Sequence, residues 1–553
     1  MQLVRAENNR FQNVLKATGL SLGIILLAIQ LNCIYYYQPD DYLMNYINRG
    51  SFGNTADPYV VFINVMFGRI TAAFYNLLPQ INWFGIMYIS AVGFIFWALF
   101  YIFLEMKKSY ISLIVIGILE FATMLCLTFT VIAYMGAAAF GAYCVHILTG
   151  EKRDTDKIII SLFLLMIGLG FRNGKKVLLS SLIIYIPVFW EKVRNIRFWK
   201  MKWYLLLVVF VCVFMWKYNG NQYYRNEFWS EYKEYNSVRS SVLDNPITDY
   251  EDNREDLERL GISQNDLTCL KQWIFADKNV YSLNTMRALA DMNDLTEKRE
   301  VNLSNIFKSM VKEKYNYLFA IFAVLFLVYS ANGKRSIVAL IALFTYILIA
   351  ALFVRNRPVE RVMIPIYFSG IIAIMFCGFG KVNDDYKKIK CIVEITVCVL
   401  LLIVSWYLGR EAMCINDQKT VEKIKYEEVW DYIQNNQEYL FVGSSATINE
   451  MLGLSDIFNV GEELVTGNVM KLGTWDMYSS RYYSQVKKYN LLHKDSVLLS
   501  MVENDNIIYM VAKDYDFQTD YIMTFLKEHT KDSVSVELVG NFNESEILMY
   551  KCY

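Results

Sequence analysis

Apolar runs recur along the first three quarters of the chain and are separated by short polar loops. Each run is close to the length of an α-helix that crosses a bilayer, and few of its residues are charged. The pattern predicts a polytopic α-helical membrane protein with about eleven transmembrane helices. We place them at residues 18–37, 82–105, 109–131, 133–149, 158–171, 176–190, 203–218, 315–330, 336–354, 362–379 and 391–408.

The composition supports a membrane protein and gives no sign of a nucleic-acid partner. Of the 553 residues, 55% are hydrophobic and 20% are charged, which is too apolar for a soluble chain of this length. Lys plus Arg and Asp plus Glu number 54 each, so no charge excess points to a nucleic-acid partner. The cysteines form no metal-binding spacing. The sequence leaves open whether Cys414 and Cys552 form a disulfide.

The distribution of lysine and arginine in the short loops predicts the orientation. With eleven spans, most basic loops fall on one side, which we assign to the cytoplasm together with the N-terminus. One basic loop, "FRNGKK" (171–176), falls outside, either because it meets an anionic partner or because the spans in 109–149 are miscounted. We expect a multi-pass protein of a bacterial cell membrane with three large outer segments, at residues 38–81, 219–314 and 409–553.

The outer segments carry their own patterns. Residues 58–79 are apolar at helical spacing, which predicts a helix on the membrane surface, with a twelfth span as the alternative. Residues 219–314 read as short helices, one of them capped by Ser263. Residues 409–553 alternate helix and strand patterns, so we divide the chain into a transmembrane domain (1–408) and an extracytoplasmic α/β domain (409–553). A serine-rich turn, "VGSSATINEML" (442–452), could bind an anion, but helix capping is the favoured interpretation.

Two adjacent carboxylates follow the first span, in "QPDDYL" (38–43). Neighbouring residues on a helix point about 100° apart, so Asp40 and Asp41 are not expected to act as a matched pair. We expect one of them to face an active cleft as a general base and the other to hold an arginine or a metal. The alternative is that both lie at an ordinary solvated helix end.

Basic side chains are predicted on the same outer face, in two short loops. Arginine forks match phosphate oxygens, and the chain has no nucleotide-binding motif, so a lipid phosphate is the simplest anion. Within the predicted spans, Glu120 is expected to face the bundle interior, paired or protonated, and is the residue that favours transport. The candidate phosphate-binding residues are Arg172, Lys175, Arg355, Arg357 and Arg361.

These features resemble the GT-C membrane glycosyltransferases over about 400 residues. In that family an acidic motif in the first outer loop supplies the catalytic carboxylate, a surface helix follows in the same loop, and basic residues of later outer loops hold a lipid-phosphate donor. "QPDDYL" is similar to the first feature, residues 58–79 to the second, and Arg172 with the 355–361 cluster to the third. The trailing α/β domain looks like those of bacterial cell-surface polysaccharide transferases.

The resemblance implies an enzyme of the hexosyltransferase class. It would move a sugar from a polyprenyl-phosphate-linked donor to an extracytoplasmic glycan or teichoic acid. The alternatives are a lipid-linked glycan polymerase or ligase, and a polysaccharide transporter or flippase. The resemblance leaves open whether a divalent cation, Mg²⁺ or Mn²⁺, is needed, because no second acidic pair completes a metal site in the sequence.

Overall fold

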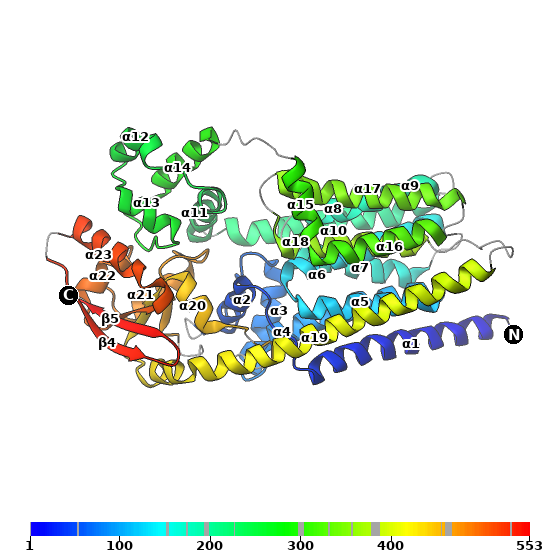
Figure 1. Cartoon of the computed structure of the whole chain (residues 1–553), viewed down its shortest axis with the longest axis horizontal. Helices are drawn as coiled ribbons and strands as arrows, with labels where there is room; N and C mark the ends of the chain where they lie inside the picture. The colour runs from blue at the N-terminus through cyan, green and yellow to red at the C-terminus, as the bar shows by residue number, and fades with distance from the viewer. Residues whose placement is uncertain are drawn as a thin grey trace.

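The structure is a computed structural model of the whole chain. It describes residues 2–51, 55–150, 154–172, 175–192, 198–225, 227–296, 303–329, 332–354, 358–377, 387–454, 456–458, 467–530 and 533–553. The molecule is elongated, with a bundle of long helices at one end and a globular part at the other (Figure 1). The two chain termini lie at opposite ends of this long axis (Figure 1).

The helix bundle contains the apolar runs of the sequence. Its helices are α1 (Gln2–Gln30), α4 (Trp83–Glu105), α5 (Tyr110–Leu125), α6 (Phe129–Thr149), α7 (Thr155–Gly170), α8 (Lys175–Ile184), α9 (Ile186–Lys192), α10 (Phe198–Tyr224), α15 (Leu303–Lys312), α16 (Lys314–Tyr329), α17 (Asn332–Val354), α18 (Glu360–Cys377) and the first part of α19 (Lys387–Asn435).

Seven of the described helices are long and apolar enough to cross a membrane, and two shorter helices are also apolar. A small five-stranded sheet lies in the C-terminal region. The predicted class, a polytopic helical membrane protein with a C-terminal α/β domain, is therefore confirmed. The number of eleven spans remains a prediction.

Helix α6 lies at the centre of the bundle. In the apolar stretch of this helix 94% of the residues are buried, and the helix packs against α4, α7, α8 and α18. Small residues make this position possible, because a Cβ at Gly136 would come 3.1 Å from the backbone nitrogen of Gly168 in α7. Gly136 therefore allows α6 and α7 to pack closely.

Two predicted helix boundaries are wrong for local reasons. The first helix ends at Gln30, not at 37, and the tyrosine segment that follows is not helical, with the N–H of Tyr37 bonded to the carbonyl of Leu127. The break between the third and fourth predicted spans lies at residues 126–128, not near 132. It is set by Thr128, whose side chain caps α6 by accepting a hydrogen bond from the N–H of Thr130.

The first outer segment forms two helices. α2 (Pro39–Arg49) begins with a proline at its first turn and ends at Gly50, whose positive φ of 86° suits a helix end. α3 (Val65–Leu77) is shorter than the predicted helix at 58–79, because Asn64 caps it. Ile70, Phe74 and Leu77 of α3 remain exposed, and their location at a membrane surface stays a prediction.

The predicted short helices of the middle segment are present. They are α11 (Glu227–Leu243), η2 (Glu251–Asn253), α12 (Arg254–Arg259), α13 (Gln264–Lys271) and α14 (Leu283–Thr296). Ser263 caps α13 as expected, in a reciprocal capping box with Asp266.

The C-terminal region is a mixed sheet covered by helices. The strand order is β2-β1-β3-β5-β4, with β1 parallel to β2 and β3 and the last two strands antiparallel. Its elements are β1 (Leu440–Gly443), α20 (Ser445–Leu452), β2 (Val469–Lys471), α21 (Ser480–Lys488), α22 (Val497–Glu503), β3 (Ile507–Ala512), η5 (Lys513–Tyr515), α23 (Phe517–His529), β4 (Val536–Phe542) and β5 (Ile547–Cys552).

The middle helices and the C-terminal region share one apolar core. This core joins Val242 and Leu289 of the middle segment to Val442 and Val511 of the sheet. We call the two segments together the globular part. Helix α19 runs without a break across residue 409, the predicted start of the C-terminal domain. It therefore links the bundle to the globular part (Figure 1). Cys414 and Cys552 are both free thiols, the first exposed and the second buried.

Candidate functional site

A cavity of about 930 Å³ lies where the helix bundle meets the globular part. Six cationic and two anionic residues line it. The membrane-side residues, which come from the bundle and the first outer segment, include Gln38, Asp40, Phe129, Arg172 and Arg361. The globular-side residues include Arg239, Trp273, Ser445, Lys471, Trp475 and Gln518.

Asp40 faces this cavity from the first turn of α2. Its carboxylate lies 3.4 Å from the guanidinium of Arg361, at the start of α18, and each side chain is about one quarter exposed. Arg361 also donates a hydrogen bond of 2.7 Å to the side-chain oxygen of Gln38. The structure thus brings one predicted carboxylate and one predicted arginine, 321 positions apart in sequence, to one point of the cavity.

Asp41 points away from the cavity and is fully buried. Its Oδ1 accepts hydrogen bonds from the hydroxyl of Tyr88 at 2.8 Å and from the N–H of Phe129 at 2.9 Å. Burial raises the pKa of Asp41 to about 7, against the lowering effect of these two hydrogen bonds. Asp41 therefore anchors the start of α6 to α2 and α4, and it does not line the cavity.

The different roles expected for Asp40 and Asp41 are only partly correct. One of them does face a cavity, and they point apart as neighbours on a helix do. However, the arginine is held by Asp40, the same residue that faces the cavity. Asp41 instead satisfies a backbone N–H at a helix start, where a carboxylate is favoured by the helix dipole.

Arg172 lines the cavity just after α7. Its guanidinium hydrogen-bonds to the hydroxyl of Thr130 and lies over the ring of Phe129, 5.4 Å from the ring centre. Both contacts are with the first turn of α6, the turn that Asp41 anchors. Arg172 and Asp41 therefore both contact the first turn of α6.

The other predicted site residues fall elsewhere. Arg355 and Arg357 lie outside the described residues. Lys175 begins α8, but the position of its side chain is not described. Glu120 is fully buried between helices of the bundle, where it accepts a hydrogen bond of 2.6 Å from Ser21 of α1, and it does not line the cavity.

Two buried cations of the cavity were missed by the sequence analysis. Arg239 in α11 is 5% exposed, and Lys471 at the end of β2 is 6% exposed. Burial lowers the pKa of Lys471 to about 8, although the nearby carboxylates of Asp476 and Asp40 oppose this effect. A signal existed, because each cation interrupts an apolar pattern, in "SVRSSVL" and in "VMKLG".

Three residues that line the cavity each have one buried side-chain atom with no hydrogen-bond partner. Within the described part of the chain these are the indole N–H of Trp475, the side-chain oxygen of Gln518 and one terminal nitrogen of Arg239. Buried polar atoms are nearly always paired in folded proteins, so unpaired ones at a cavity are suited to a polar ligand. Two tryptophans, Trp273 and Trp475, also line this cavity.

The serine-rich turn at 442–452 behaves as the favoured capping interpretation predicts. Ser444 caps α20, and its side chain accepts a hydrogen bond of 3.3 Å from the N–H of Thr447. The same turn also lies at the cavity, because Ser445, Ala446 and Asn449 line it.

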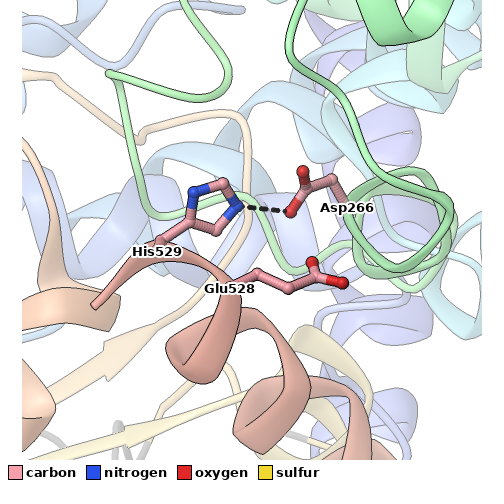
Figure 2. Close-up of side chains that lie close together, drawn as sticks. All are labelled: Asp266, Glu528 and His529. Carbon is pink, nitrogen blue, oxygen red and sulfur yellow. Dashed lines mark hydrogen bonds and ion pairs between the residues drawn. The ribbon is translucent and has the colours of Figure 1, made fainter. Parts of the chain in front are cut away.

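One group of metal-ligating side chains lies together among the described residues, away from the cavity. Figure 2 shows His529 of α23 pointing to Asp266 of α13, with Glu528 beside them. His529 lies 2.9 Å from Asp266, and the hydroxyl of Ser263 donates to Glu528 at 2.7 Å. These contacts tie α13 to α23 and suit a structural junction. The sequence leaves open whether the reaction needs a divalent cation, and these contacts do not test it.

Comparisons with known proteins give a distant structural likeness. No family model matches the chain, and no curated protein matches it by sequence. Two crystal structures of ArnT from Cupriavidus metallidurans are similar to it, one in the apo state and one bound to undecaprenyl phosphate. The first is 11% identical with a TM-score of 0.41 and covers 97% of this chain and 98% of its own; the second is 10% identical with a TM-score of 0.40 and covers 96% and 98%. At this distance the likeness assigns neither a substrate nor the role of any residue.

Proposed function

We propose that this chain is an integral membrane glycosyltransferase. It transfers a sugar from a polyprenyl-phosphate-linked donor to a hydroxyl of an extracytoplasmic glycan. The observation that carries the proposal is the pairing of Asp40 with Arg361 at 3.4 Å in a cavity at the end of the helix bundle. A carboxylate beside an arginine suits a reaction that needs a base and a phosphate site next to each other.

Donor binding would change the partner of Arg361. The phosphodiester of the donor carries one negative charge and competes with the carboxylate of Asp40 for the guanidinium, and Arg172 lines the same cavity. When Arg361 turns to the phosphate, Asp40 loses its ion pair and its carboxylate is open to the acceptor hydroxyl. The sugar carbon attached to that phosphate then lies near Asp40.

The transfer step follows from these positions. Asp40 accepts the proton of the acceptor hydroxyl while the hydroxyl oxygen forms a bond to the anomeric carbon of the sugar. The bond from that carbon to the phosphate oxygen breaks, and its electron pair leaves with the polyprenyl phosphate. Arg361 and Arg172 stabilise the charge that develops on the leaving phosphate, and such electrostatic stabilisation is often a large part of catalysis.

The membrane orientation of the proposal comes from the basic loops. If those loops are cytoplasmic, the cavity and the globular part lie outside the cell membrane. Lipid-linked sugars on that face would reach the cavity from the bilayer, beside the ends of the bundle helices.

The proposal is tested by deleting the gene in its native host. Mass spectrometry of the surface glycans should show one sugar substituent lost, and the corresponding polyprenyl-phosphate sugar should accumulate in the membrane. Complementation with the intact chain should reverse both changes. Unchanged glycans together with an unchanged lipid pool would contradict a transferase, and loss of whole glycan chains from the surface would indicate a polymerase, ligase or transporter.

A further inference from the structure

The globular side of the cavity holds two buried cations without carboxylate partners. Among the described residues, neither Arg239 nor Lys471 has a carboxylate oxygen within 4.0 Å, the ion-pair limit. Asp40 pairs with Arg361, and Asp476, the acid nearest in sequence to Lys471, pairs with Arg481. Asp244 also lines the cavity and raises the pKa of Arg239 against the lowering effect of burial, but it forms no ion pair with it.

The contacts of these two cations are with neutral groups. The Nε of Arg239 donates to Asn236 at 3.0 Å, and its guanidinium lies over Trp273 at 5.5 Å, which leaves one terminal nitrogen without a partner. The ammonium of Lys471 is 2.5 Å from the side-chain oxygen of Asn449 and 5.4 Å from the ring centre of Tyr42. A buried charge is costly when it is not paired, so this arrangement favours a bound anion.

The backbone at the same place adds to the positive potential. The first turn of α20 lines the cavity through Ser445 and Ala446. The first N–H groups of a helix have no partner within the helix and carry partial positive charge. Together with the unpaired guanidinium nitrogen, they give an anion several donors from three different elements: α11, β2 and α20.

We infer that Arg239, Lys471 and the first turn of α20 form a second anion subsite, which holds a phosphate or carboxylate group of the acceptor glycan. The inference rests on the proposed function, and it names the class of acceptor: an anionic glycan. Arg361 and Arg172, which come from the bundle, serve the lipid phosphate. The cavity thus binds two anions at once, one on each substrate.

The test uses the full-length protein in nanodiscs and two kinds of probe. Undecaprenyl phosphate reports the membrane-side residues, while glycerol phosphate and glucuronate report the globular-side subsite. In wild type, both kinds should bind together. Arg239→Gln and Lys471→Met should each weaken binding of a soluble probe by about tenfold or more, the loss expected for one charged contact, and leave undecaprenyl phosphate binding unchanged. Arg259→Gln and Lys494→Met, which change exposed residues, are the matched controls.

Thermal unfolding separates a ligand site from a merely structural role. Without probe, Lys471→Met should unfold at the same or a higher temperature than wild type, because it removes an unpaired buried charge. It should also lose the stabilisation that the soluble probe gives to wild type.

Two results would overturn the inference. The first is competition between undecaprenyl phosphate and the soluble anions, which would assign Arg239 and Lys471 to the donor. The second is that neither soluble probe binds wild type at concentrations of about 20 mM, which lies beyond the weak end of ordinary affinities. Failure of undecaprenyl phosphate to bind would instead contradict the proposed function, so the two failures are distinct.

Discussion

The membrane-side and globular-side residues of the cavity differ in how their cations are balanced. Arg361 has a carboxylate 3.4 Å away and is a quarter exposed, whereas Arg239 and Lys471 are more deeply buried and have only neutral partners among the described residues. An arginine that already has an acidic partner can exchange it for a phosphate and release a base. A buried cation without such a partner can only gain from binding an anion. This difference distinguishes the proposed reacting centre from the proposed anion subsite.

The largest effect is expected at the reacting centre. Asp40→Asn should reduce the rate of sugar transfer by about 10²- to 10⁴-fold, the usual contribution of a general base. Asp41→Asn is the matched control, because it keeps an oxygen for the N–H of Phe129, and it should stay within about tenfold of wild type. Transfer assays on membranes with equal protein levels check both. A larger loss in Asp41→Asn than in Asp40→Asn would break the assignment.

Arg361 should follow Asp40 in size of effect. Arg361→Gln removes both the phosphate contact and the partner of Asp40, so we expect a decrease of about 100-fold in kcat/KM for the donor. Arg361→Lys should recover only part of this loss, because an ammonium cannot form the two-pronged contact of a guanidinium. Donor titrations measure both variants. Equal activity of Arg361→Gln and wild type would contradict a phosphate site among the membrane-side residues.

The buried Asp41 should make stability depend on pH. Its pKa in the folded chain, about 7, lies above the ordinary value of about 3.9, so folding favours the neutral acid. This stabilising contribution is complete below about pH 4 and is lost as the pH rises through about 7. The unfolding temperature of wild type in nanodiscs should fall by several degrees more between pH 5 and pH 8 than that of Asp41→Asn. Parallel curves for the two proteins would contradict the burial argument.

A smaller effect is expected at the junction between α13 and α23. The hydrogen bond to Asp266 raises the pKa of His529, against the lowering effect of burial (Figure 2). Its stabilising contribution is therefore present at low pH and is lost as the pH rises through this raised pKa. His529→Gln should lower the unfolding temperature by about 1–2 °C at pH 6 and by less at pH 9. A larger loss at pH 9 would contradict the charged pair.

The smallest effect is expected at Glu120, and its substitution distinguishes a transferase from a transporter. Glu120 belongs to α5, accepts a hydrogen bond from Ser21 of α1 and lies outside the cavity. Glu120→Gln should leave sugar transfer within about twofold of wild type. Loss of surface glycan in this variant, at normal membrane levels of protein, would favour transport through the bundle.

The membrane-side residues were open to prediction because they follow long apolar runs. Bilayer thickness fixes where such runs end, and charged residues just beyond them must lie near the surface, so Asp40, Arg172 and Arg361 could be named together. Their pairing could not be predicted, since it depends on how α2 and α18 pack. Helix boundaries such as that at Thr128 were missed because a single capping side chain sets them. Hydrophobicity does not change there.

The globular-side residues had no comparable constraint. Arg239 and Lys471 are two of 54 basic residues, and only tertiary packing of the middle helices against the sheet brings them to the cavity. Lys471 also lies in a three-residue strand, which is too short for its alternation to be recognised. A charge within a short apolar run was the one available signal, and it is weak because such residues also occur at ordinary surfaces.

The most direct test of the central claim is a structure of the full-length chain in nanodiscs with undecaprenyl phosphate. We predict that the lipid phosphate lies within hydrogen-bond distance of Arg361, with Arg172 beside it, and that Asp40 has separated from Arg361 and faces the open cavity. A lipid phosphate bound elsewhere, or one bound at this cavity while the Asp40–Arg361 pair stays closed, would contradict the account.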